Sequence, residues 1–406
     1  MAYQEVTTTS YGKRVGNSFK GIGGGILLFV AATVLLWWNE GRAVKTDKML
    51  NEAEKACVQM ENPNKKDATL DGELVCATAV ATTQDSLIDS RFGFGATAIS
   101  LQRSVEYYQW VEHAESKSED KLGGKEVTTT TYTYTREWVS SPIRSESFKD
   151  PDYQNKNMVL TTVEDEYQWA ENVSFGAYKL NESLIHSISS TEPVELALSE
   201  DLLKQLNDGI SRQAKKDSLG YVHQNGNVLY FGRVPSSPEV GDVRVTWEKV
   251  VPAKVTIIAQ VDGDTFKAFK AKNGKTFQTL VMGSKDAGEI FDSEHSSNKM
   301  LLWVFRILGV ILAIAGLKGI FGFLETLLKV VPFLANILGW GVGLVCSVVG
   351  IVWSLIVIAI AWLFYRPVLG IALLVLAGSI IWFFAFKGKD KVKELMAKNK
   401  KAEADA

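Results

Sequence analysis

The sequence predicts an α-helical multipass membrane protein with four transmembrane helices and a large β-rich extracytoplasmic or luminal domain. Three observations support this fold class. Long uncharged blocks lie near the N-terminus and in the last hundred residues, a strand-like region of about 260 residues separates them, and lysines gather at both ends of the chain. The net charge of -2 averages over these unlike parts, so it excludes no class of function.

The first predicted transmembrane helix covers residues 21–39, with residues 1–20 before it. Between Lys20 and Glu40 there are 19 uncharged residues, which match a hydrocarbon core of about 30 Å at about 1.5 Å rise per residue. The block ends in Trp37 and Trp38, which suit the membrane interface. A signal peptide has a shorter apolar core, so we interpret the block as an uncleaved anchor.

The second predicted span, residues 300–323, is apolar apart from Arg306 and Lys318. The two charges lie about 18 Å apart along a helix and near opposite ends of the span. We expect them to be membrane-charge anchors whose side chains extend to the two headgroup layers. The alternative is that they line a path for an ion or a substrate.

A further uncharged stretch of 36 residues, 330–365, is too long to cross the bilayer as one straight helix of about 54 Å. We therefore predict an interfacial helix and a bend over residues 324–342, followed by a third span over 343–364. Gly339, Gly341 and Gly343 mark the expected bend.

Arg366 and Pro367 are expected to form a tight corner after the third span, because a proline disfavours helix at the residue before it. Arg366 would be a third membrane-charge anchor. A fourth span is predicted over residues 368–386, which are again uncharged, and a basic tail follows over 387–406.

Basic residues flank the first and the last predicted span, which by the positive-inside rule places both termini in the cytoplasm. Residues 40–299 then face the exterior, the periplasm or a lumen. The tail could contact anionic lipid headgroups, at about 1 kcal/mol per lysine, or serve only to set the topology. It lacks aromatic residues that would stack on bases, so no nucleic acid partner is predicted. The tail lysines concerned are Lys387, Lys389, Lys391 and Lys393.

The region between the first two spans is predicted to be mainly strands. Residues 100–115 and 128–138 form an expected long hairpin around Gly123 and Gly124. Asn225 and Gly226 give a strong signal for a second, tight hairpin. Alternating segments then continue as a meander from 242 to 282, and helices are expected over 195–206 and 287–298. A small barrel would accommodate this pattern.

Residues that carry chemistry are sparse. The four histidines are isolated, and no metal-ligand spacing, nucleophile elbow or nucleotide-binding loop is present. Glu112, Glu137 and Asp242 are the acidic residues that a surface enzyme could use, but such positions more often serve ion pairs or strand edges. We therefore predict no enzyme, no metal and no cofactor.

Cysteines and glycines suggest two structural features. Cys57 and Cys76 both lie in the exported region, where a disulfide between them would be worth about 3 kcal/mol; Cys346 lies in a predicted span. Glycines four residues apart allow close helix packing, either inside the chain or in a dimer. These pairs are Gly21 with Gly25 and Gly339 with Gly343.

Four short blocks in order resemble the LUMA family, also called transmembrane protein 43. They are NEGRA at 39–43, YQWVE at 108–112, EVGDVRV at 239–245 and WLFYRP at 362–367. The resemblance implies a multipass protein that self-associates and organises its membrane. In a eukaryote it implies the endoplasmic reticulum and inner nuclear membrane, with emerin and lamins as partners. Related proteins also occur in bacteria, where the inner membrane would be the site.

These observations favour a non-enzymatic integral membrane scaffold that organises membrane structure and protein complexes. Its expected partners are the lipid bilayer, further copies of the chain and other membrane proteins. The alternative is an ion or small-molecule channel or transporter, for which Arg306, Lys318 and the glycine-rich bend would be the relevant features.

Overall fold

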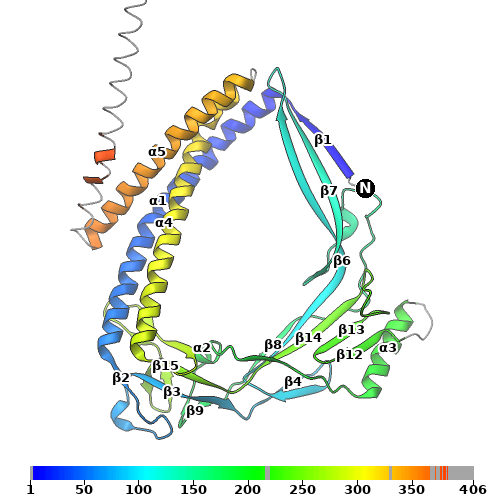
Figure 1. Cartoon of the computed structure of the whole chain (residues 1–406), viewed down its shortest axis with the longest axis vertical. Coiled ribbons are helices and arrows are strands. Elements are labelled where there is room, and N and C mark those ends of the chain that lie inside the picture. Colours follow the sequence, from blue (N-terminus) through cyan, green and yellow to red (C-terminus); the bar gives the residue numbers. More distant parts are fainter. Residues whose placement is uncertain are drawn as a thin grey trace, which may run out of the picture. The chain divides into compact units, whose positions relative to one another are not determined.

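A computed structural model describes residues 3–214, 220–328 and 332–365, together with seven helical residues between 371 and 382. The chain divides into two compact units. The first comprises residues 1–5, 49–117 and 129–293, and the second residues 6–48, 118–128 and 294–406. Figure 1 shows that strands make up most of the first unit and long helices most of the second.

The β-rich unit contains two open, mainly antiparallel sheets rather than the expected barrel. The first has the order β1-β7-β6-β14-β13-β12, with β8 on β6 and β11 on β14. Its strands are β1 (Tyr3–Thr9), β6 (Ser100–Asp120), β7 (Glu126–Val139), β8 (Glu166–Trp169), β11 (Thr191–Pro193), β12 (Val222–Asn225), β13 (Val228–Phe231) and β14 (Val243–Val250).

The second sheet has the order β10-β9-β3-β15-β16, with β19 on β15 and β2 parallel to β3. Two small ribbons and short helices complete the unit. The second sheet comprises β2 (Cys57–Gln59), β3 (Leu74–Thr83), β9 (Val173–Phe175), β10 (Tyr178–Lys179), β15 (Ala253–Asp262), β16 (Thr265–Lys267) and β19 (Thr279–Met282). The remaining elements are β4 (Ser86–Asp89), β5 (Phe94–Thr97), β17 (Phe269–Lys270), β18 (Thr276–Phe277), α2 (Glu182–Ile185), α3 (Glu200–Ala214) and 3₁₀ turns at Ala68–Leu70 and Ser145–Ser147.

Alternation of buried and exposed side chains explains why these segments form half-buried strands. In β14 the buried side chains are those of Val243, Val245 and Trp247, and they pack in one hydrophobic core under the first sheet. A second core, which includes Val255 and Ile257 of β15, lies under the second sheet. The first sheet thus buries one face, which is the usual condition for an antiparallel sheet. In the second sheet β15 is buried on both faces, because Val255 and Ile257 pack in one core and Ile258 packs in another.

Both predicted hairpins are confirmed. Gly123 and Gly124 have positive φ between β6 and β7, and Gly226 has a φ of 58° between β12 and β13. The helix expected over 195–206 is displaced to α3 (Glu200–Ala214), because the segment before it is extended: Val194 and Leu196 are buried in the core of the first sheet. The helix expected at 287 begins there.

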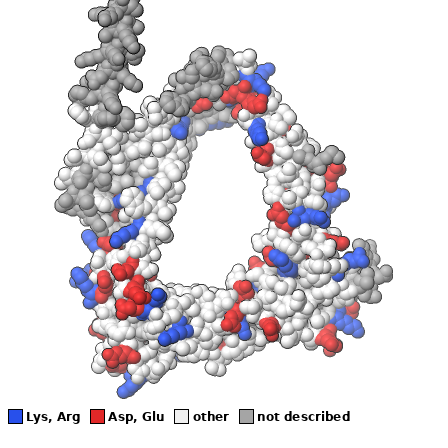
Figure 2. All heavy atoms as spheres, in the orientation of Figure 1, with Lys and Arg blue, Asp and Glu red and all other residues white. Residues whose placement is uncertain are grey.

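The helical unit is built from α1 (Tyr11–Ala56), α4 (Ala287–Leu328) and α5 (Pro332–Tyr365). Each contains a segment long and apolar enough to cross a membrane. The last turns of α1, from Met49, and the first turns of α4, up to residue 293, belong to the β-rich unit. There Met49, Leu50 and Phe291 share a core. In Figure 2 the surface over the middle of α1 and α4 is largely uncharged.

The C-terminal region is only partly described. The chain is helical without interruption through Gly339, Gly341 and Gly343, and the bend expected there stays a prediction. Glycine costs a helix about 1 kcal/mol but leaves every backbone N–H in place, and an apolar environment favours the intact helix. The fourth span, 368–386, lies mostly outside the described residues, as do Arg366 and the tail.

Candidate functional site

A buried carboxylate joins the three long helices of the helical unit. Glu40 of α1 is 1 % exposed and accepts two hydrogen bonds from Arg306 of α4, with Nε–Oε1 2.6 Å and Nη2–Oε2 2.9 Å. The indole N–H of Trp362, in α5, donates to the same carboxylate. The guanidinium of Arg306 also lies over the rings of Trp303 and Trp362, 4.9 and 5.2 Å from their centroids.

This arrangement follows from the cost of burying charge. An isolated carboxylate in an apolar environment is strongly destabilised, and a bidentate arginine is the partner that best compensates it. Arg306 was expected to extend toward a headgroup layer. The structure instead places its side chain, 12 % exposed, on Glu40.

Polar contacts between α1 and α4 continue along the next turns. Asn39, which is fully buried, donates to the carbonyl of Leu302 at 3.0 Å. Asn298 donates to the carbonyl of Ala43 at 3.0 Å and accepts from Arg42 at 3.2 Å. Because these groups satisfy one another, the register of α1 on α4 is specified by hydrogen bonds as well as by shape.

One turn further, His295 of α4 lies 3.2 Å from Asp47 of α1, measured from Nδ1 to Oδ1. The Glu40 network, the hydrogen bonds of Asn298 and the Asp47–His295 pair therefore lie in succession along α1. A pocket of about 250 Å³ opens beside them and is lined by both charged and aromatic side chains. The lining includes Glu40, Asp47, Asn298, Lys299, Trp303 and Trp362.

Glycines bring the backbones of α1 and α4 into contact closer to their other ends. A Cβ on Gly25 would lie 2.7 Å from the carbonyl oxygen of Gly316, and one on Gly319 would lie 3.0 Å from the Cα of Gly25. Gly21 faces the Gly319 carbonyl at 3.9 Å. The predicted pair Gly21 and Gly25 thus packs inside the chain, which leaves this face unavailable for a dimer.

The remaining predicted membrane residues are dispersed. Lys318 is exposed on α4, and its Cε lies 3.7 Å from the Cβ position of Gly343 in α5. Gly339 is in the same helix. Arg366, Lys387, Lys389, Lys391 and Lys393 lie outside the described residues. The structure therefore brings Lys318 and Gly343 together, but not Lys318 and Arg306.

Cys57 and Cys76, for which the sequence favours a disulfide, are free thiols in this structure. They lie on the parallel neighbours β2 and β3, where Cys57 is opposite Leu74 and Cys76 is opposite Gln59. Burial, reinforced by the nearby Cys76, raises the pKa of Cys57 to about 12. Burial, reinforced by Asp286, raises the pKa of Cys76 to about 11. The raised pKa of each thiol disfavours its thiolate form at neutral pH.

The acidic residues that an enzyme could have used are engaged in local hydrogen bonds of the β-rich unit. Glu112 accepts from the Tyr134 hydroxyl at 2.6 Å, and Glu137 lies 2.9 Å from His113. Asp242 accepts from the Tyr230 hydroxyl at 2.5 Å. The three carboxylates serve three different contacts, and within the described residues no group of acidic, histidine and cysteine side chains could hold a metal ion.

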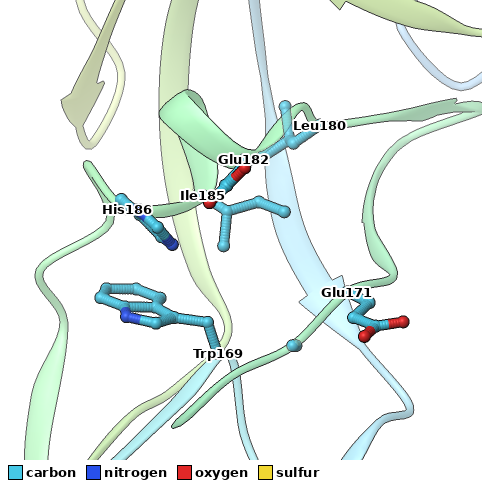
Figure 3. Close-up of a pocket in the computed structure, with 7 residues that line it drawn as sticks. Trp169, Glu171, Leu180, Glu182, Ile185 and His186 are labelled. Carbon is cyan, nitrogen blue, oxygen red and sulfur yellow. The ribbon is translucent and has the colours of Figure 1, made fainter. Parts of the chain in front are cut away.

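A pocket of about 470 Å³ lies in the β-rich unit between Trp169 and α2. His186 packs on Trp169 with ring centroids 4.4 Å apart. Figure 3 shows Glu171 directed away from this pair, so the pocket does not combine its histidine with that carboxylate. The rings of Trp169 and His186 form an aromatic wall of the pocket, and Glu182 of α2 is a second carboxylate in its lining.

Comparison with known proteins identifies the family. The family model described as Transmembrane protein 43 matches residues 107–367. The chain belongs to the transmembrane protein 43 family. It is 31 % identical to Transmembrane protein 43 of Rattus norvegicus and 30 % identical to that of Homo sapiens, over 87 % of both chains in each case. It is 26 % identical to the Transmembrane protein 43 homolog of Drosophila melanogaster, over 88 % of this chain and 93 % of the homolog. No solved structure shows a significant match.

Membership of the transmembrane protein 43 family, together with the apolar helices, makes this an integral membrane protein. The family match includes Arg306 and Trp362. Glu40 and Trp362 are site residues that were not predicted from the sequence. A signal for Glu40 was available, because Glu40 lies directly after an uncharged block within NEGRA, where a charge needs a partner.

Proposed function

We propose that this chain is a non-enzymatic integral membrane scaffold that organises membrane structure and protein complexes by associating with further copies of itself. The observation that supports this most is the Glu40–Arg306–Trp362 network, which joins three apolar helices through one carboxylate. Such a network joins the three helices to one another, so that they are not a set of independent anchors.

The network also bears on the channel alternative. Arg306 is one of the two charges on which that alternative depends, and it is neutralised by Glu40. A charge that is consumed in a bidentate pair attracts a passing ion far less than a free one. The bilayer and other membrane proteins remain the proposed partners, with emerin and lamins among them if the source is a eukaryote. Both termini are proposed to be cytoplasmic, from the lysine flanks.

Crosslinking in native membranes tests the scaffold. We expect dimers or larger species after treatment with a short amine-reactive reagent, and the same species by native mass measurement from detergent. Monomers alone in both measurements would contradict the proposal. Ion flux through liposomes that contain the purified chain tests the alternative, and we expect no flux above that of empty liposomes.

A further inference from the structure

Two side chains of opposite charge face one pocket of the helical unit, the cavity of about 250 Å³ between α1, α4 and α5. Lys299 of α4 is exposed, and among the residues that the structure describes its ammonium has no ion-pair partner. Asp47 of α1 is 27 % exposed and shares its carboxylate with His295. The other two charges in the lining, Glu40 and Arg306, neutralise each other. The pocket therefore presents a free positive charge and a partly exposed carboxylate to its occupant.

The pocket lies at the edge of the hydrocarbon core. Glu40 is the first charged residue after the 19 uncharged residues of α1, and its pairing with Arg306 places that residue of α4 at the same depth. Lys299 precedes Arg306 in α4 by about 10 Å along the helix axis. With the ordinary tilt of a membrane helix, this distance places the ammonium of Lys299 in the headgroup layer, which extends about 5–8 Å beyond the core.

One ridge of α4 continues from the pocket into the membrane. Four of its residues are spaced by four positions, so they follow one another along the same side of the helix. They are Lys299, Trp303, Ile307 and Ile311, of which the last three are 60, 58 and 56 % exposed. The ridge is about 18 Å long, which is close to the depth of one leaflet. Its polarity falls from a cation through an indole to aliphatic side chains, as it does along a phospholipid from the phosphate to the acyl chains.

The volume of the pocket indicates a ligand that is only partly enclosed. Sites that bury a whole small molecule have volumes of about 300–1,000 Å³, whereas this cavity has about 250 Å³. A ligand bound here therefore extends beyond the pocket, and the ridge of α4 is the apolar surface that begins at its lining, with Trp303. A phospholipid meets both conditions, because its headgroup can enter the pocket while its acyl chains stay in the bilayer.

We propose that this pocket binds the headgroup of a zwitterionic phospholipid. The phosphate contacts the ammonium of Lys299, the amine of the headgroup contacts Asp47, and one acyl chain lies along the ridge of α4. A net anionic headgroup would satisfy Lys299 but would place no positive charge near Asp47, so opposite charges on the ligand match the pocket better than one charge does. A primary amine is favoured because its N–H groups can donate to the carboxylate.

This inference depends on the membrane helices and not on self-association. It goes beyond the proposed scaffold by naming the class of lipid that the chain holds. The residues concerned all belong to the helical unit.

Titration of the full chain with defined lipids tests the ligand class. The delipidated protein is kept in a nonionic detergent, and bound lipids are counted by native mass spectrometry. Phosphatidylethanolamine, phosphatidylglycerol and diacylglycerol with the same acyl chains are compared. We expect one phosphatidylethanolamine to bind in preference to phosphatidylglycerol, and no saturable binding of diacylglycerol. Absence of phosphatidylethanolamine binding, or equal or tighter binding of either other lipid, would overturn the proposal.

Reversal of one charge tests the location of the site. Lys299→Glu should weaken the binding of phosphatidylethanolamine about tenfold or more, because it replaces attraction of the phosphate by repulsion. Lys48→Glu is the matched control, since Lys48 is exposed on α1 next to Asp47 but does not line the pocket. Asp47→Asn should remove the preference for phosphatidylethanolamine over phosphatidylglycerol while phosphate binding persists.

The outcomes distinguish the lipid site from the scaffold. Equal binding by the two lysine variants would overturn the pocket as the site, whether both lose affinity or neither does. Thermal unfolding checks that each variant is folded, and Lys299→Gln, which only removes the charge, should give an intermediate loss of affinity. A parent chain that crosslinks as an oligomer but binds no phosphatidylethanolamine would overturn the lipid site alone. A monomeric chain that binds the lipid would overturn self-association alone.

Discussion

The two units each contain a buried carboxylate held between an arginine and an indole N–H, but they support it differently. In the helical unit, Glu40 is held by Arg306 and Trp362. In the β-rich unit, Asp89 at the end of β4 accepts from Arg103 of β6 at 2.6 Å and from Trp247 of β14 at 2.8 Å. Both sets therefore join three elements, although Asp89 and Arg103 are only 14 positions apart in the sequence.

The difference lies in how many further partners each set has. Asp89 also accepts from the backbone N–H groups of Arg91 and Phe92, at 3.0 and 3.2 Å, and Arg103 has a second carboxylate, Glu166, at 2.9 Å. Within the described residues Arg306 forms an ion pair with Glu40, and its guanidinium also lies over the rings of Trp303 and Trp362. If Asp89 is lost in the strands, Glu166 still compensates the charge of Arg103. If Glu40 is lost in the helices, the charge of Arg306 loses the carboxylate that compensates it.

The largest expected effect is that of Glu40→Gln. It leaves the guanidinium of Arg306 without a charge partner in an apolar environment, so we expect the free energy of unfolding to fall by about 3–5 kcal/mol. Thermal unfolding in detergent measures the loss. Glu289→Gln is the control, because the exposed pair of Glu289 with Lys285 at 3.4 Å is worth less than about 1 kcal/mol. Equal stability of the two variants would show that the Glu40 network does not contribute to the free energy of unfolding.

Asp89→Asn should be less damaging than Glu40→Gln, although both remove one negative charge. Glu166 continues to compensate Arg103, and the amide oxygen can still accept from Trp247. We expect a loss of about 2–3 kcal/mol by the same unfolding measurement. The double variant with Glu166→Gln should lose more than the sum of the single variants. If the losses of the two single variants simply add, Asp89 and Glu166 do not compensate Arg103 jointly.

A smaller effect is expected where helices meet through backbone rather than charge. Gly25→Ala places a Cβ 2.7 Å from the carbonyl oxygen of Gly316, so α1 and α4 must separate, at a cost of about 1–3 kcal/mol. Gly24→Ala is a matched control one position away, because nothing lies within 4 Å of its Cβ position. The control should be neutral or stabilising, since alanine favours helix. A loss of stability in both variants would mean that the close contact is not the cause.

The smallest expected effect is a change in pH dependence at Asp242 of the β-rich unit. Burial raises the pKa of this carboxyl above its ordinary value, although hydrogen bonds from Tyr230 and Glu239 oppose the rise. The folded state therefore binds the proton more tightly than the unfolded state. This contribution is complete below the ordinary pKa and is lost as the pH rises through the folded-state pKa.

Asp242→Asn removes that titration, so its stability relative to the parent should increase as the pH rises from the ordinary carboxyl pKa through the higher folded-state pKa. Chemical unfolding at several pH values measures the difference. Asp262→Asn is a control, because Asp262 forms an exposed pair with Lys267. An identical pH profile for the parent and the Asp242 variant would show that burial does not perturb this carboxyl.

The sequence was sufficient to predict structure where residues close together along the chain determine it. The hairpin at Asn225 and Gly226 is an example, because a glycine with positive φ closes a two-residue turn without help from the rest of the fold. The three apolar helices follow from length and composition. The barrel was wrong, because sheet closure depends on packing partners that periodicity does not identify.

The sequence by itself determined that the chain is embedded in a membrane, that its large middle region consists of strands, and that it belongs with a known family. These properties depend on composition and on short-range alternation. Only the tertiary structure decided that Arg306 pairs with Glu40, 266 positions away, and that Arg14 pairs with Asp120 in the β6–β7 hairpin. The sequence shows that a charged residue next to an apolar block needs a partner if it is buried. Which distant side chain becomes that partner is determined by the tertiary structure.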